Sequence, residues 1–175
     1  MCYGQSDIDL ADTYEDDILD LRNRLPFDND AVVYSSPFKR CTTLAAALNP
    51  NFIASPAISE MHFGDWELQP WDEINTETLN NWMLDFVSYK IPGGENFEAM
   101  YTRCANFWDE LLTKDHKAVL LVTHAGVIRS ILAHVLGIPL QKVFQLQIDY
   151  SSISKITYDV NYKNQVVVYI NQIKP

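Results

Sequence analysis

The run VLLVTHAGVIRS, residues 119–130, decides the fold class of this chain. Residues 119–122 are apolar without a polar break, which is typical of a parallel strand covered on both faces. The apolar residues after His124 recur at helical spacing, and Gly137 and Pro139 predict the end of that helix. A histidine at the carboxyl end of such a strand lies where open α/β sheets bind ligands. The free N–H groups and the dipole of the following helix favour an anion such as phosphate.

Composition limits the class of protein and of partner. The chain has 175 residues, 47% of them hydrophobic and 21% charged, which predicts one globular domain spanning 1–175. Its apolar runs are too short to cross a membrane, and its first residues lack the features of a signal peptide. The net charge of −10 excludes a nucleic-acid backbone as the main partner. A small anionic metabolite remains a possible ligand if a few arginines gather in a pocket.

The cysteines indicate a reducing compartment. Cys2, Cys41 and Cys104 are an odd number without a C-x-x-C pair, so we expect neither a structural disulfide nor a zinc site. A cytoplasmic protein follows from that pattern. Cys41 and Cys104 fall on expected helical faces and are predicted to be core residues.

Periodicity and turn residues predict further helices and strands. The helices are expected at 14–25, 36–48 and 97–111, and the strands at 31–34, 143–148, 153–158 and 166–171. We expect Pro26 to end the first helix and Ser36 to cap the second. The order predicts a three-layer α/β/α sandwich, with a mostly parallel sheet and an antiparallel edge. Residues 55–95 form a less regular, aromatic-rich insertion.

Three residues at element junctions have chemistry suited to phosphoryl transfer. Arg40 can clamp a phosphate bidentately. Glu60 lies among aromatic residues, where a carboxylic acid with a raised pKa can protonate a leaving oxygen. His124 can hold a phosphoryl oxygen or attack phosphorus. Each alone is more often structural, such as a surface ion pair, a solvated loop carboxylate or a capping histidine. Their combination, in this order, favours a phosphate site.

The motifs around these residues resemble those of the histidine phosphatase superfamily, which has the phosphoglycerate-mutase-like fold. SSPFKRC at 35–41 resembles its second-arginine motif, and THAG at 123–126 resembles its second-histidine motif. Glu60 with the following Phe-Gly and Trp-Glu pairs resembles its acid loop. CYGQSD at 2–7, the tryptophans of the acid loop and PGGE at 92–95 are most similar to the α-ribazole phosphatase branch.

The resemblance implies a role for each residue. Arg40 would grip the phosphoryl group, Glu60 would protonate the leaving oxygen and His124 would hydrogen-bond the phosphoryl oxygens. The residues bordering the substrate would be Gly4, Gln5 and Ala125. The implied reaction forms a phosphohistidine that water then hydrolyses, with no metal or other cofactor.

The implied substrate is α-ribazole 5′-phosphate, in cobalamin biosynthesis. A broad phosphomonoesterase, a sugar-phosphate mutase and a non-catalytic phosphate-binding module remain alternatives. The expected partner is thus a small phosphorylated metabolite, with no nucleic acid and no membrane. The oligomeric state stays open, a dimer included.

One departure from the family is large. The Arg-His-Gly triplet, which in the family ends the first strand and supplies the nucleophile, does not occur in this sequence. His62, His116 and His134 do not replace it in sequence context. We expect that strand to lie upstream of Met1, so that this chain is N-terminally truncated, lacks the nucleophile and turns over weakly or not at all.

Two features of the insertion keep alternatives open. Its aromatic group, which includes Trp66, Trp71 and Trp82, could be a lid that stacks on a flat base such as a benzimidazole, or simply the core of the insertion. Glu95 could start the next helix or contact the substrate.

Overall fold

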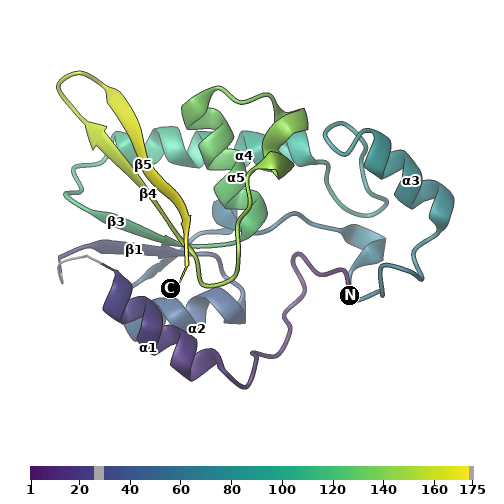
Figure 1. The fold of residues 1–175 in the computed structure, drawn as a ribbon, viewed down its shortest axis with the longest axis horizontal. Coiled ribbons are helices and arrows are strands. Elements are labelled where there is room, and N and C mark those ends of the chain that lie inside the picture. Colours follow the sequence, from purple (N-terminus) through teal and green to yellow (C-terminus); the bar gives the residue numbers. More distant parts are fainter. Residues whose placement is uncertain (26–29, 174–175) are drawn as a thin grey trace.

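Three parallel strands form the centre of the computed structural model, which describes residues 1–25 and 30–173 (Figure 1). The sheet order is β2-β1-β3, for β1 (Val32–Ser35), β2 (Ile53–Ala54) and β3 (Val119–Val122). Val32 lies opposite Val119 and Ser35 lies opposite Val122, so β1 and β3 end at the same edge. The predicted fold class is confirmed, and the residues that follow both strands emerge side by side.

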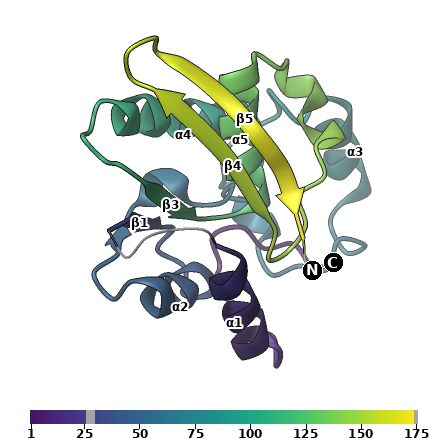
Figure 2. The ribbon, with the colours of Figure 1, turned by 60° about the vertical axis from the view of Figure 1, so that its left-hand side comes forward.

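Helices cover both faces of this sheet (Figures 1 and 2). They are α1 (Tyr14–Arg24) and α2 (Lys39–Leu48) on one face, and α4 (Phe97–Leu112) and α5 (Ala125–Leu136) on the other. The helix predicted at 97–111 forms as α4, and it buries one apolar face that includes Cys104 and Trp108. Val127 and Ile131 of α5 belong to the same core. As predicted, Gly137 ends α5, with a left-handed φ of 65°.

The two strands predicted at 153–158 and 166–171 form an antiparallel hairpin beside the three-stranded sheet. β4 (Ile153–Asp159) and β5 (Asn164–Gln172) pair with each other in antiparallel register. The indole N–H of Trp108 donates to the side-chain oxygen of Gln165 at 2.7 Å, which fastens the hairpin to α4. Figure 2 shows the hairpin crossing the helical layer that contains α4 and α5.

The predicted strand at 143–148 is wrong. Leu140–Gln145 is a 3₁₀ helix, η3, which follows Pro139. The φ of −55° at Pro139 suits entry into a helical turn. Val143 is fully buried while Phe144 beside it is 53% exposed. The apolar residues of this run therefore reflect one buried face of a short helix and an exposed ring, rather than a buried strand.

The predicted Ser36 cap is also wrong. α2 begins at Lys39, its N-cap position is Phe38, and no side chain caps it. Ser36 is fully buried, and its hydroxyl contacts His124 instead. The helix 14–25 forms as α1, whereas its predicted stop at Pro26 lies outside the described residues.

The insertion contains one regular helix. α3 (Thr76–Leu84) follows the cap Asn75, whose side chain accepts the backbone N–H of Thr78. Short 3₁₀ turns lie at Pro56–Ile58 (η1) and Gly64–Trp66 (η2). In Figure 1, α3 stands at one end of the molecule, away from the hairpin.

Two strand edges have no strand partner among the described residues. β3 pairs only with β1, and β4 pairs only with β5. All three cysteines are free and buried, and for Cys41 and Cys104 that burial was predicted. No helix in the described part of the chain is long and apolar enough to span a bilayer.

Candidate active site

His124 lies where β3 gives way to α5. It is the N-cap residue of α5, in extended conformation, and only 9% of it is exposed. Its Nδ1 accepts a hydrogen bond from Nε of Arg40 at 3.3 Å, and its Nε2 lies 2.7 Å from the hydroxyl of Ser36. Since the guanidinium has no acceptor, Nδ1 is the unprotonated nitrogen and Nε2–H donates to Ser36. The parallel register of β1 and β3 thus brings together Arg40 and His124, two of the predicted site residues.

The imidazole is neutral at physiological pH. Burial, with the positive charges of Arg40 and Arg103, lowers the pKa of His124 to about 3. A phosphate dianion beside the ring would reverse part of that effect, because a negative charge favours the imidazolium.

Arg40 is held by the loop that opens the chain. Its guanidinium donates to the backbone carbonyls of Gly4 and Ser6, and lies 5.1 Å from the ring centre of Phe38. With the bond to His124, three of its five N–H groups have partners among the described residues. Two remain for a ligand, which is the number that a bidentate phosphate contact needs.

Glu60 rests on the N-terminus of α5. Its carboxylate oxygens accept the backbone N–H groups of Met61 at 2.9 Å and Gly126 at 3.1 Å. A Cβ atom at position 126 would lie 2.2 Å from Oε1 of Glu60, so only glycine allows this approach. Burial raises the pKa of Glu60, although the two N–H groups and the charges of Arg103 and Arg40 act against it. A carboxyl group that keeps its proton toward neutral pH suits a proton donor.

Arg103 braces the acid loop, a role that the sequence does not predict. Its guanidinium donates to the carbonyls of Ala57, Ser59 and Glu60, and pairs with Glu95 at 2.7 Å. Glu95 does not cap α4, because the side chain of Asn96 does. The only sequence signal for the pair is its spacing of eight residues, which equals about two helical turns.

Glu67 anchors the opening loop in the same way. Its carboxylate accepts the backbone N–H groups of Gly4, Gln5 and Ser6 at 2.8–3.1 Å, and that of Phe63 at 3.0 Å. Burial raises the pKa of this carboxyl, but the N–H groups outweigh it and the net pKa lies below the ordinary value. The side-chain amide of Gln5 also donates to the backbone carbonyl of Glu60, at 3.0 Å. Both predicted loop residues, Gly4 and Gln5, are therefore at the site.

The remaining histidines have other contacts. His134 lies 2.8 Å from the carboxylate of Asp109, and His116 lies 3.4 Å from the hydroxyl of Tyr34. His62 donates its backbone N–H to Glu95. Among the described residues, no group of three or more His, Cys, Asp or Glu side chains could hold a metal ion.

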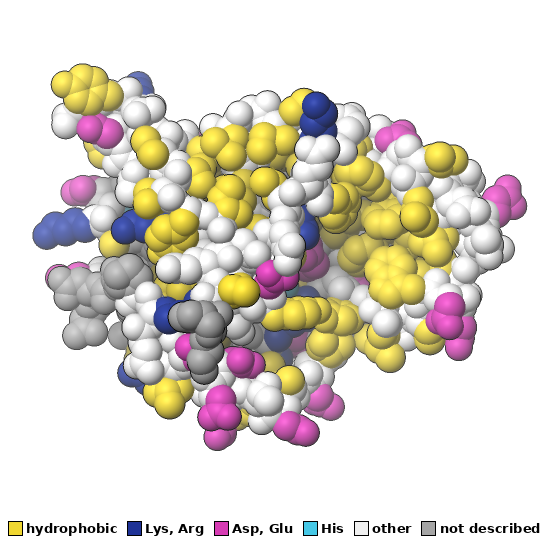
Figure 3. All heavy atoms as spheres, viewed as in Figure 1, with side chains coloured by type: hydrophobic (Ala, Val, Ile, Leu, Met, Phe, Trp, Pro, Cys, Tyr) yellow, Lys and Arg dark blue, Asp and Glu magenta, His cyan; other side chains and the backbone are white. Residues whose placement is uncertain are grey.

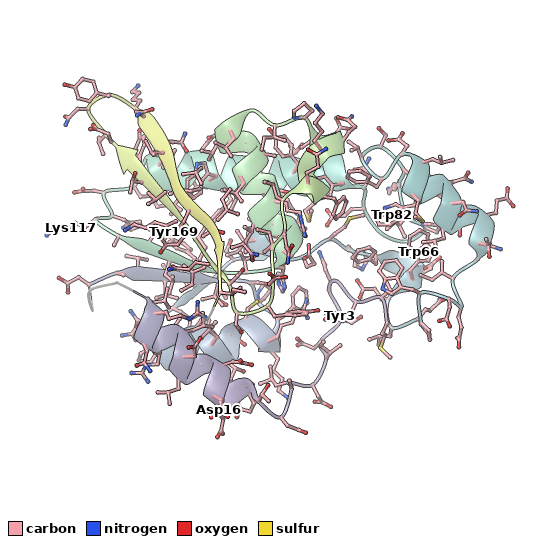
Figure 4. All side chains as sticks on the ribbon, viewed as in Figure 1. Tyr3, Asp16, Trp66, Trp82, Lys117 and Tyr169 are labelled. Atoms are coloured by element: carbon pink, nitrogen blue, oxygen red, sulfur yellow. The ribbon has the colours of Figure 1, made fainter. Side chains whose placement is uncertain are left out.

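The aromatic residues of the insertion pack mainly on one another. Consecutive ring centres from Phe63 through Trp82 and Phe86 to Phe144 lie 4.8–6.4 Å apart. Trp66 is buried, while Trp71 stacks on Trp82 and is 38% exposed. Figure 4 places Trp66 and Trp82 in the insertion and Tyr3 between it and the sheet, and Figure 3 shows hydrophobic side chains gathered over this end of the molecule. The core alternative fits most of these rings.

Comparison with known proteins decides the family. Residues 1–172 match the family described as "Histidine phosphatase superfamily (branch 1)". The chain belongs to the histidine phosphatase superfamily. Members that resemble it are named as phosphatases, so the chain is an enzyme by family.

Two relatives of known sequence are named as phosphatases of different substrates. The putative phosphoserine phosphatase 2 of Hydrogenobacter thermophilus is 24% identical over 149 residues, which are 81% of this chain and 72% of that protein. The adenosylcobalamin/alpha-ribazole phosphatase of Escherichia coli is 31% identical over 120 residues, or 66% of this chain and 58% of that protein.

A solved structure shares the fold. A putative alpha-ribazole-5′-P phosphatase from E. coli superposes with a TM-score of 0.86 and 23% identity, covering 98% of this chain and 88% of that one. At that identity, the likeness shows the phosphoglycerate-mutase-like fold.

We expect His124 to make the chain less stable as pH falls. Its pKa is about 3 in the folded state and about 6.5 when unfolded, so the unfolded chain binds a proton first. The contribution is complete above pH 6.5 and is lost as the pH falls from there toward 3. Between about pH 7.5 and about pH 5 the loss attributable to His124 is about 2 kcal/mol.

Urea unfolding of the wild type and of His124→Asn, at both pH values, checks this. The other titrating groups are common to both chains, so the variant should lose about 2 kcal/mol less. Equal losses in the two chains would contradict a buried neutral His124.

We expect Gly126→Ala to destabilise the chain by about 1–3 kcal/mol, because the new methyl group collides with Glu60. In a Glu60→Ala background the same substitution should be neutral or stabilising, since alanine favours a helix over glycine. A double-mutant cycle by thermal unfolding measures the coupling. An equal cost in both backgrounds would show that Glu60 does not occupy this position.

Proposed function

We propose that this site binds the phosphoryl group of a small phosphomonoester and hydrolyses the ester through a phosphohistidine. One observation carries the proposal: Arg40, Glu60 and His124 converge at the N-terminus of α5. A guanidinium with two unused donors, a carboxyl with a raised pKa and a helix N-terminus are together suited to phosphoryl transfer.

Each group has a separate task in this proposal. Arg40 and the backbone N–H of Ala125 hold the equatorial oxygens, where charge is spread in the transition state. His124 hydrogen-bonds the same oxygens, exchanging its present bond to Ser36 for one to the ligand. Glu60 gives its proton to the ester oxygen as the P–O bond breaks. It then takes a proton from the water that attacks phosphorus, as the P–N bond breaks and the imidazole of the nucleophile leaves.

The nucleophile belongs, in our proposal, to a strand that fills the open edge of β3. A strand parallel to β3 on its unpaired side would end close to His124, because parallel strands end at the same sheet edge. The other edge of such a strand could form hydrogen bonds with the unpaired edge of β4. The family resemblance implies that this strand ends in Arg-His-Gly.

The first candidate substrate is α-ribazole 5′-phosphate. The E. coli relative is named for it, and the partly exposed ring of Trp71 supplies a face on which a flat base can stack. A second candidate is a phosphomonoester with an anionic leaving alcohol, which Arg129 of α5 favours because it takes part in no ion pair of the described residues.

We expect the 175-residue chain to bind inorganic phosphate without appreciable turnover. Isothermal titration should show binding that Arg40→Gln weakens roughly 10–100-fold, the effect of losing charged hydrogen bonds. Arg22→Gln, at an exposed position, is the matched control and should bind like the wild type. Retained affinity in Arg40→Gln would refute the phosphate site.

Supplying the strand should restore catalysis. We expect a chain extended by an apolar strand ending in Arg-His-Gly to hydrolyse p-nitrophenyl phosphate, and the same extension with Arg-Gln-Gly to be inactive. The unextended chain provides the baseline. Rapid hydrolysis by that unextended chain would place the nucleophile among its own residues instead.

A further inference from the structure

The guanidinium of Arg129 has one hydrogen bond and one ring contact among the described residues. Its Nε donates to the backbone carbonyl of Leu146 at 2.9 Å, and its guanidinium lies 5.2 Å from the ring centre of Phe144. The side chain is half-buried. Its four remaining N–H groups have no hydrogen-bond partner among the described residues. The head group is thus fixed in direction and keeps donors available.

The absence of an ion pair is unusual for this chain. The other half-buried arginines outside the phosphate site are paired, Arg24 with Asp20 and Arg103 with Glu95, each at 2.7 Å. Arg129 takes part in none of the ion pairs of the described residues, although acidic residues outnumber basic ones by 23 to 13. A partly desolvated cation without a partner costs free energy, which a bound anion would recover.

Helix geometry places Arg129 on the face of α5 that carries Gly126, whose backbone N–H binds Glu60. It follows Gly126 by three residues on α5, and residues so spaced are neighbours on one helix face. Side chains on a helix lean toward its N-terminus, so Arg129 leans toward the end where Glu60 is bound. Burial lowers the pKa of Arg129, while the charges of Glu60 and Asp149 oppose that shift. The leaving alcohol, which Glu60 protonates, would therefore pass beside this guanidinium.

We propose that Arg129 binds a carboxylate on the leaving alcohol, and so selects phosphomonoesters of hydroxy or amino acids. The inference rests on the proposed function of the site and names its substrate class. A planar carboxylate matches two parallel N–H groups of a guanidinium. The nearby charge of Asp149 disfavours a second phosphate more than a carboxylate, because a dianion is repelled more strongly. α-Ribazole 5′-phosphate has no carboxylate to offer.

A matched pair of ligands tests this. O-Phosphoserine and O-phosphoethanolamine differ only in the carboxylate, and both can be titrated calorimetrically into the chain as it exists. Inorganic phosphate, titrated in parallel, reports on the phosphate site alone. We expect phosphoserine to bind about tenfold more tightly than phosphoethanolamine, as one charge-assisted pair would give.

Variants of Arg129 show whether this side chain binds the carboxylate or only stabilises the fold. Arg129→Gln should remove the difference between the two ligands while leaving phosphate affinity within about twofold. Arg129→Lys should keep part of it, since the charge remains but the planar fork is lost. Arg22→Gln is again the matched surface control. Circular dichroism of each variant verifies that it is folded.

The outcomes are distinct. Equal affinity for the two ligands in the wild type, with phosphate bound, overturns the role of Arg129 and leaves the proposed function standing. A ligand difference that survives in Arg129→Gln overturns it as well. If no phosphate compound binds, the proposed function fails and the inference fails with it.

Discussion

The register between β1 and β3 is the constraint on which the site depends. Val32 faces Val119, so the two strands end together and Ser36 meets His124. A slip of one residue would turn the side chains of a strand to its opposite face and separate the hydroxyl from the imidazole. The hydrogen bond between these residues in turn fixes the tautomer that accepts from Arg40. Backbone pairing within the sheet therefore decides the tautomer of a side chain beyond it.

Two carboxyl groups at the site have pKa values shifted in opposite directions by their environments. Glu67 accepts four backbone N–H groups and its pKa falls below the ordinary value. Glu60 accepts two, and burial prevails, so its pKa rises. The first is a permanent anion that orders the opening loop. The second can release a proton, and the contrast comes from the deeper burial of Glu60 together with its smaller number of donors.

Local patterns correctly predicted β3, α5 and the position of His124 between them, because covered strands and helix stops depend on neighbouring residues. Ser36 failed as a cap because a partner 88 positions away holds its hydroxyl. Arg103 and Glu67 were missed for a similar reason. Their partners are mostly backbone groups, which leave no mark on residue type, and they meet only after the chain folds. The family resemblance supplied the roles that we propose for Arg40 and Glu60, which spacing alone could not give.

The open edge of β3 also matters for how the protein behaves in solution. An uncovered strand edge presents a row of N–H and C=O groups that can pair with any extended chain, including another molecule of the same protein. Natural sheets block such edges with charged residues or proline, and β3 consists only of valine and leucine. A strand paired with that edge would protect the protein from edge-to-edge aggregation. Solubility and catalysis would then depend on the same few backbone hydrogen bonds.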